Sequence, residues 1–248
     1  MELIGTTIAW LTDPANWQGP DGIPTRVLAH ILVSGTALLI ALLIGLPIGL
    51  IVGHTRKGAA VAINVANIGR ALPTLAVITL VLPVTVLIDN QLGFKVYPTL
   101  IALVILGLPP IIVNTYTGIS SVDPDLIEAA RGMGLTERRV LSRVEIPVAI
   151  PVISGGVRAA ATQIVATATL GAIFGGVGLG RFLVEGIAQN DNGMIFGGVT
   201  LVALLCVATE GLFALIQRRL TSPGLAPAAV WMSRGRTAPA AASESSSV

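Results

Sequence analysis

Long apolar stretches without charged residues alternate along the chain with short polar stretches. The longest occupies the 29 positions between Arg26 and Arg56. Four further stretches without Asp, Glu, Lys or Arg cover residues 71–88, 96–122, 159–180 and 192–209. A helix crosses the hydrocarbon core of a bilayer with about 20 predominantly apolar residues. The pattern therefore predicts an all-α integral membrane protein with five core transmembrane helices.

The first stretch carries the strongest membrane signal. Residues 27–52 include 16 Leu, Ile and Val side chains, which favour insertion by about 5–10 kcal/mol at roughly 0.3–0.6 kcal/mol each. Charged residues make up 11% of the chain, against about 25% in soluble domains. A soluble protein with five such helices in its core would have almost nothing left to cover them. Glu2 is also atypical of the basic start of a cleaved signal peptide.

Basic residues are distributed unevenly between the expected helices. If five helices alternate across the bilayer, residues 53–59, 121–147 and 217–248 share one side, and together they hold ten Lys and Arg. The other side holds three. Cytoplasmic segments are enriched in Lys and Arg. The sequence therefore predicts a cytoplasmic C-terminus and an N-terminus outside the cell.

The ends of the chain differ in composition from the membrane domain, which spans residues 27–220. Residues 1–26 contain Trp10 and Trp17 next to a run of turn residues, a pattern typical of an interfacial segment with aromatic anchors. Residues 221–248 are rich in Ala, Pro and Ser. We expect this cytoplasmic tail to be disordered.

Few residues with metal-binding or reactive side chains are present. Cys206 is the single cysteine, and His30 and His54 are far apart in sequence, so we expect no disulfide or Cys/His metal site. The formal net charge of +2 does not indicate a nucleic-acid partner. Glu210 is a functional candidate because it is ionisable and lies at the end of an apolar stretch. We expect it near the cytoplasmic end of its helix, with Arg218 as a basic neighbour.

Small residues recur every fourth position in the first apolar stretch, at Gly45, Gly49 and Gly53. Such spacing lets membrane helices approach closely. Several such pairs also arise by chance in a chain with 28 glycines.

The loop between the third and fourth expected helices, residues 121–147, predicts a helix, a glycine turn and a second helix. Asp123 is a good N-cap and Pro124 suits the first helical position. Gly132 and Gly134 can take the left-handed conformation that ends a helix. We expect Thr136 to cap the second short helix, residues 137–143, before the chain enters the membrane.

The same loop resembles the EAA motif of the membrane subunits of bacterial ABC importers. That motif reads Glu-Ala-Ala, three residues, Gly, nine residues, and then Ile, any residue, Leu-Pro. Here it stands as Glu128-Ala129-Ala130, Gly134 and Val144-Glu145-Ile146-Pro147. The spacing matches throughout, and the two departures, at Val144 and Ile146, keep an apolar side chain. Glu-Ala-Ala alone is a frequent helical triplet, so the full spacing carries the resemblance.

The resemblance implies that this loop forms a coupling helix, which docks on a separate ATP-binding subunit and transmits its closure to the membrane helices. The residues that it assigns to this coupling are Glu128, Ala129, Ala130, Gly132, Gly134 and Pro147. The alternative is a solvated amphipathic loop.

ATP chemistry is not expected on this chain. A Walker A loop ends in Gly-Lys-Ser/Thr, whereas Lys57 and Lys95 are followed by Gly58 and Val96. We therefore expect a non-catalytic translocation subunit that binds no cofactor, with ATP and Mg used by the partner. The glycine cluster at residues 175–180 superficially resembles a dinucleotide loop. It follows an expected helix and has no evident basic partner in sequence, so we expect an outer turn that contacts a docking partner.

Further segments resemble the permeases for glycine betaine, carnitine and choline. The similar segments are residues 70–76, 114–119, 122–124, 167–170 and 178–180. The resemblance implies ATP-driven import of an osmoprotectant by alternating access. Permeases for methionine or polar amino acids share the coupling loop and remain an alternative. An ion-coupled secondary transporter is an alternative from another class, which the lack of a visible repeat does not favour.

The resemblance also implies a set of partners in a bacterial cell membrane. These are two copies of an ATP-binding subunit, a second permease subunit in a homodimer or heterodimer, an extracytoplasmic substrate-binding protein and the membrane lipids.

Polar side chains inside the apolar stretches are candidates for a substrate path. The candidates are Thr74, Asn114, Gln163, Thr167 and Thr169. Hydrogen bonds between packed helices, worth about 0.6 kcal/mol each, explain such residues equally well. Quaternary ammonium ligands are held in aromatic cages, yet aromatic residues make up 4% of the chain. We therefore expect selectivity to reside mainly in the binding protein.

Overall fold

The computed structural model describes residues 2–221, and this part of the chain is helical, with no strand. In chain order the elements are α1 (Glu2–Thr12), the 3-10 helix η1 (Pro14–Trp17), α2 (Ile23–Thr55), α3 (Ala59–Ala71), α4 (Thr74–Ile88), α5 (Leu92–Lys95), α6 (Tyr97–Ser120), α7 (Pro124–Gly132), α8 (Glu137–Val140), the π-helix η2 (Leu141–Glu145), α9 (Ile146–Thr167), the 3-10 helix η3 (Ala168–Phe174), α10 (Gly180–Gln189) and α11 (Asn192–Leu220). The disordered tail expected from residue 221 onward falls outside the described residues, apart from Thr221.

The expected all-α membrane architecture is confirmed. Four helical segments are long and apolar enough to cross a membrane, namely α2, α6, the continuous run Glu137–Phe174 and α11. The pair α3 and α4 makes a fifth candidate if it counts as one bent span. The chain is therefore a multi-pass membrane protein.

The second expected span differs from its prediction. The charge-free stretch 71–88 corresponds to α4, and a separate helix, α3, precedes it. The two helices meet at 88°. Leu72 and Pro73 take extended backbone conformations between them, because a proline disfavours the helical conformation of the residue before it.

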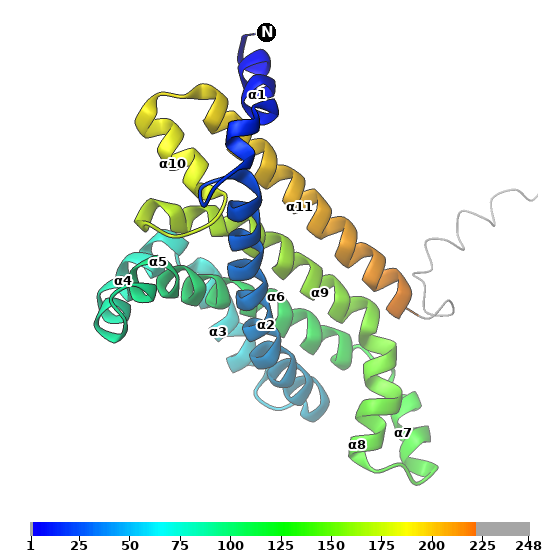
Figure 1. Cartoon of the computed structure of the whole chain (residues 1–248). Coiled ribbons are helices and arrows are strands. Elements are labelled where there is room, and N and C mark those ends of the chain that lie inside the picture. Colours follow the sequence, from blue (N-terminus) through cyan, green and yellow to red (C-terminus); the bar gives the residue numbers. More distant parts are fainter. Residues whose placement is uncertain (1, 222–248) are drawn as a thin grey trace, which may run out of the picture.

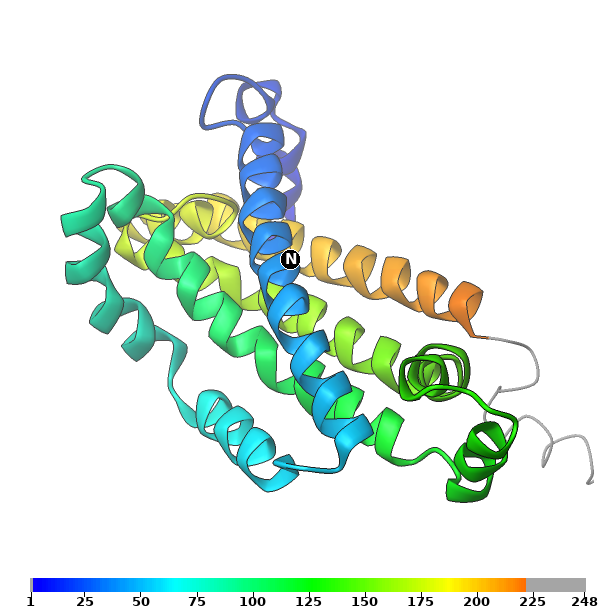
Figure 2. The ribbon, with the colours of Figure 1, turned by 90° about the horizontal axis from the view of Figure 1, so that it is seen from below.

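The centre of the fold is α6, which packs against α2, α9, α3 and α4. Figure 2 shows α2 crossing α6. Where they cross, Gly45, Gly49 and Gly53 of α2 lie against α6, and a Cβ atom at Gly49 would come within 2.6 Å of Thr115. The close approach expected from the glycine spacing is confirmed.

The fourth span begins earlier than the sequence predicts. The expected helix at 137–143 is not a separate element, because α8 continues through the π-helix η2 into α9. Pro147 is the second residue of α9 and lies inside this continuous run, so it has no N–H to donate to the preceding turn. Regular α-helix then ends at Thr167, before the expected stretch 159–180 is complete. The 3-10 helix η3 and Gly175, at φ +78°, follow.

The two ends of the bundle carry different elements. Figure 1 shows α7 and α8 at one end of the molecule, and α1 and α10 toward the other. Trp10 of the N-terminal segment packs edge-on against Phe182 of α10, with ring centroids 5.0 Å apart. This contact fixes α1 to the fold.

Candidate functional site

The loop with the Glu-Ala-Ala triplet begins with the helix start that the sequence predicts. Oδ1 of Asp123 accepts a hydrogen bond from the backbone N–H of Asp125 at 2.9 Å. Pro124 is the first residue of α7. An N-cap of this kind satisfies a backbone donor that the helix itself leaves unpaired.

The end of α7 is a Schellman motif, in which two backbone bonds close the last turn around a left-handed residue. The N–H of Leu135 donates to the carbonyl of Ala130 at 3.2 Å, and that of Gly134 donates to Arg131 at 2.9 Å. Gly134 has φ +82°, as expected. Gly132 is the last helical residue of α7 instead, so the left-handed prediction was wrong for it.

The two faces of α7 have different surroundings. Ala130 is buried with Ile127, Val122 and Val140 in a small apolar cluster, which we call the loop core. Glu128 and Ala129 are exposed on the other side. The triplet is therefore divided, since Ala130 holds the loop together while its two neighbours face outward.

Two exposed apolar side chains on this loop are not predicted from the sequence. Met133, between the two glycines, is 75% exposed, and Leu126 is 46% exposed. The position of Met133 between two glycines was the sequence feature that could have predicted its exposure. Together with Glu128, these residues give this end of the molecule a mixed polar and apolar surface.

An ion pair joins α7 to α8 across the glycine turn. Nε of Arg131 lies 2.9 Å from Oε1 of Glu137, and its NH2 nitrogen lies 3.0 Å from Oε2. The hydrogen-bonded Glu137 carboxylate raises the pKa of the Arg131 guanidinium. Pro147, the last residue of the motif, is exposed in the first turn of α9.

Two of the candidate path residues make hydrogen bonds to nearby backbone. Nδ2 of Asn114 donates to the carbonyl of Pro110 at 2.8 Å. Oγ1 of Thr169 donates to the carbonyl of Ala166 at 2.8 Å. These local bonds satisfy polar groups inside an apolar span without any ligand.

The five candidate path residues do not converge on one point. Asn114 of α6 faces Gly156 of α9, where a Cβ atom would lie 2.5 Å away. Gln163 and Thr167 come later on α9, about 10 and 16 Å further along at 1.5 Å per residue. Thr74 begins α4, which contacts η3, the element that holds Thr169. Asn114 is therefore separated from the other candidates on α9.

Glu210 is paired, but with a different residue than expected. Its Oε1 lies 3.2 Å from Nε of Arg158 on α9, and its Oε2 accepts a hydrogen bond from Thr162 at 3.0 Å. Arg218 was the expected basic neighbour. The sequence could not show this pairing, because the two residues approach only through the packing of α9 on α11.

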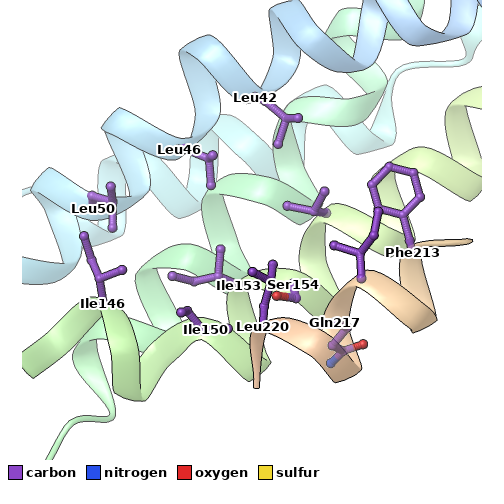
Figure 3. Close-up of a pocket in the computed structure, with 12 residues that line it drawn as sticks. Leu42, Leu46, Leu50, Ile146, Ile150, Ile153, Ser154, Phe213, Gln217 and Leu220 are labelled. Carbon is purple, nitrogen blue, oxygen red and sulfur yellow. The ribbon is translucent and has the colours of Figure 1, made fainter. Parts of the chain in front are cut away.

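A pocket of about 340 Å³ lies between α2, α9 and α11. Figure 3 shows its lining, which includes Leu42, Leu46, Ile150 and Phe213, with Ser154 and Gln217 as the polar side chains. It contains none of the candidate path residues. An apolar lining of this kind suits lipid chains or another apolar helix surface.

A more polar pocket, of about 470 Å³, lies at the opposite end from α7. The turn at residues 175–178 lines it together with Arg26, Lys95 and Arg181. The expectation that the glycine cluster lacks a basic partner was therefore wrong. The cluster follows the helix η3 rather than a strand, so it does not have the context of a dinucleotide loop.

Comparison with known proteins shows the family to which the chain belongs. The family model for binding-protein-dependent transport system inner membrane components matches residues 45–222. The choline transport system permease protein OpuBB of Bacillus subtilis is 33% identical over 200 residues, which cover 81% of this chain and 89% of that protein. The glycine betaine/carnitine/choline transport system permease protein OpuCB of the same organism is 33% identical over 79% of this chain and 87% of its own length.

A solved structure shows the same fold. A chain of the methionine ABC transporter MetNI, in an inward-facing conformation, matches with a TM-score of 0.73 and 21% identity, over 85% of this chain and 100% of that chain. The family match covers most of the residues described above, including α7 and the whole motif. The chain is therefore a member of the family of binding-protein-dependent transport system inner membrane components.

Proposed function

We propose that this chain is the permease subunit of an ATP-driven importer for osmoprotectants such as glycine betaine, carnitine or choline. One observation carries this proposal. The chain aligns with two Bacillus subtilis permeases over most of their length, and their names state these substrates. The likeness to the methionine transporter supports the fold at 21% identity. The methionine or polar amino-acid permease therefore remains the second candidate.

Coupling to ATP hydrolysis is assigned to α7 and the turn after it. One face of α7 is held in the loop core, while Glu128, Ala129 and Met133 are exposed at the end of the molecule. A surface with a polar and an apolar part suits a cleft in a partner protein. In this proposal two copies of an ATP-binding subunit receive these loops, and ATP and Mg are used there.

The orientation follows from the distribution of basic residues. With α7 on the cytoplasmic side, the N-terminal segment and the pocket lined by Arg26, Lys95 and Arg181 lie outside the cell. The substrate-binding protein docks on that outer side, and a second permease subunit completes the path. Closure of the ATP-binding subunits then moves α7 and alternates access between the two sides of the membrane.

The test is transport by the complete importer in proteoliposomes, with labelled glycine betaine as substrate. Glu128→Arg reverses an exposed charge at the docking surface, and we expect it to lower uptake by more than tenfold with normal membrane insertion. Arg139→Glu is the matched control, because Arg139 is an exposed charged residue of α8 outside the docking helix. Uptake by Glu128→Arg at the level of this control would contradict the assignment of α7.

The same assay separates the alternatives. Excess unlabelled methionine should leave glycine betaine uptake unchanged if the chain serves osmoprotectants, and competition would favour the amino-acid permease. Uptake that continues without ATP and stops when an ion gradient is dissipated would identify a secondary transporter.

A further inference from the structure

A buried carboxylate lies where the coupling loop joins the membrane helix. Glu145 is the last residue of the π-helix η2, and its side chain is 2% exposed. Buried charged groups require a partner of opposite charge or a hydrogen-bond donor. The partner here is His54 at the end of α2, whose Nδ1 lies 2.6 Å from Oε2 of Glu145.

The same histidine faces a second carboxylate. Its Nε2 lies 3.4 Å from Oε2 of Glu137 on α8, and Glu137 holds Arg131 of α7. Each nitrogen of the ring therefore has a carboxylate oxygen beside it. The four side chains Arg131, Glu137, His54 and Glu145, which we call the His54 linkage, connect α7, α8, α2 and the start of α9.

The end of α2 is itself fixed to α6. A Cβ atom at Gly53 would lie 2.7 Å from Ile119, so the two helices are in close contact there. Arg56 donates from its guanidinium to the carbonyl of Ser120 at 2.6 Å. A displacement that reaches His54 therefore reaches α6 as well.

Apolar packing alone does not make this connection. The loop core is formed by residues of the loop alone. The partly buried side chains that pack against it, which are Leu135, Val144 and Val148, belong to the loop or the beginning of α9. None of them comes from α2. Within the described residues, His54 thus supplies a side-chain link between α2 and the loop that the loop core does not provide.

We propose that His54 is a positioning residue that makes the coupling loop and the α2–α6 pair move together. This inference rests on the proposed function, because it takes α7 as the element that the ATP-binding subunit moves. Closure at α7 then displaces α2 and α6 in the same step, through Glu137 and His54. Without the linkage, a displacement of α7 reaches α2 indirectly, through the packing of α2 on α6 and α9.

A purely structural role for His54 would be to neutralise Glu145. The double variant His54→Leu/Glu145→Leu separates the two roles, since well-packed apolar residues can replace a buried ion pair without loss of stability. Glu137→Ala separates the two roles in a second way. Glu137 is 58% exposed, so its removal leaves no buried charge unpaired. Lys57→Gln is the matched control, an exposed charge three residues past His54.

The experiment measures glycine betaine import and ATP hydrolysis by the complete importer in proteoliposomes, with stability in detergent as the folding readout. His54→Leu alone should lower stability, and the double variant should restore it. For both the double variant and Glu137→Ala, we expect import per ATP hydrolysed to fall about fivefold. Lys57→Gln should keep the ratio of the unsubstituted protein.

An unchanged ratio in Glu137→Ala, or in a stable double variant, would overturn the positioning role and leave the proposed function intact. A double variant that stays unstable would leave Glu137→Ala as the deciding variant. Import by the unsubstituted protein without ATP hydrolysis would overturn the proposed function, and the inference with it.

Discussion

The contacts of α2 with α6 and of α9 with α11 hold helices together in different ways. Between α2 and α6, glycines bring the backbones together, and a Cβ atom at Gly45, Gly49 or Gly53 would come within 3.0 Å of α6. Between α9 and α11, long side chains make the contacts, since Glu210 binds Arg158 and Gln217 donates to the carbonyl of Pro151 at 3.0 Å. The apolar pocket of Figure 3 also lies beside this second contact.

This difference bears on which parts of the molecule move. Backbones in close contact cannot slide without steric overlap, so α2 and α6 form one unit. Flexible side chains can change rotamer while keeping their hydrogen bonds, so α11 can shift relative to α9 at lower cost. We therefore expect α11 to be the more adjustable helix.

The largest effect is expected from adding one methyl group between α2 and α6. Gly49→Ala places a Cβ atom 2.6 Å from Cβ of Thr115, and we expect a loss of about 3 kcal/mol, since overpacking typically costs 1–3 kcal/mol. Thermal unfolding in detergent measures it. Gly35→Ala on the same helix is the control, because a Cβ atom there meets nothing within 4 Å. Equal stability of the two variants would refute the close contact.

A smaller effect is expected at the turn that ends α7. Gly134→Ala forces a residue with a Cβ atom into φ +82°, which costs about 1–2 kcal/mol. Gly132→Ala is the control, since Gly132 is helical with open space around it. Hydrogen exchange of the α7 amides should show faster local opening in Gly134→Ala alone. Faster opening in both variants would mean that the Schellman motif does not hold the loop.

The smallest effect is expected at the contact of α9 and α11. Thr162→Val removes one hydrogen bond to Glu210, and we expect a loss of about 0.6 kcal/mol, the average for such bonds between membrane helices. Thermal unfolding in the same detergent measures it. A loss as large as that of Gly49→Ala would remove the distinction between the two helix contacts.

Much of the fold follows from the sequence because bilayer insertion depends on local composition. The spans α2, α6 and α11 lie largely within charge-free stretches. Asp123 and Gly134 mark the ends of α7 through the backbone chemistry of single residues. The helix α3 was missed because its sequence combines alanine with Asn64 and Asn67 and has no long apolar run.

The interactions that were missed join residues far apart in the chain. His54 and Glu145 are separated by 91 positions, and Arg158 and Glu210 meet only when α9 and α11 pack. The basic lining beside the glycine turn at residues 175–178 likewise comes from three separate elements. Such pairs leave no periodic signal in one sequence, so the structure was needed to find them.

The continuity of α8, η2 and α9 has a mechanical consequence. From Glu137 to Thr167 the chain forms one continuous helical run, roughly 45 Å along its axis at 1.5 Å per residue. One end of this run lies beside the glycine turn at Gly134, and the other end joins η3, which leads to the turn that lines the basic pocket. A displacement at the glycine turn is therefore carried along one helical run to the basic pocket at the opposite end of the bundle.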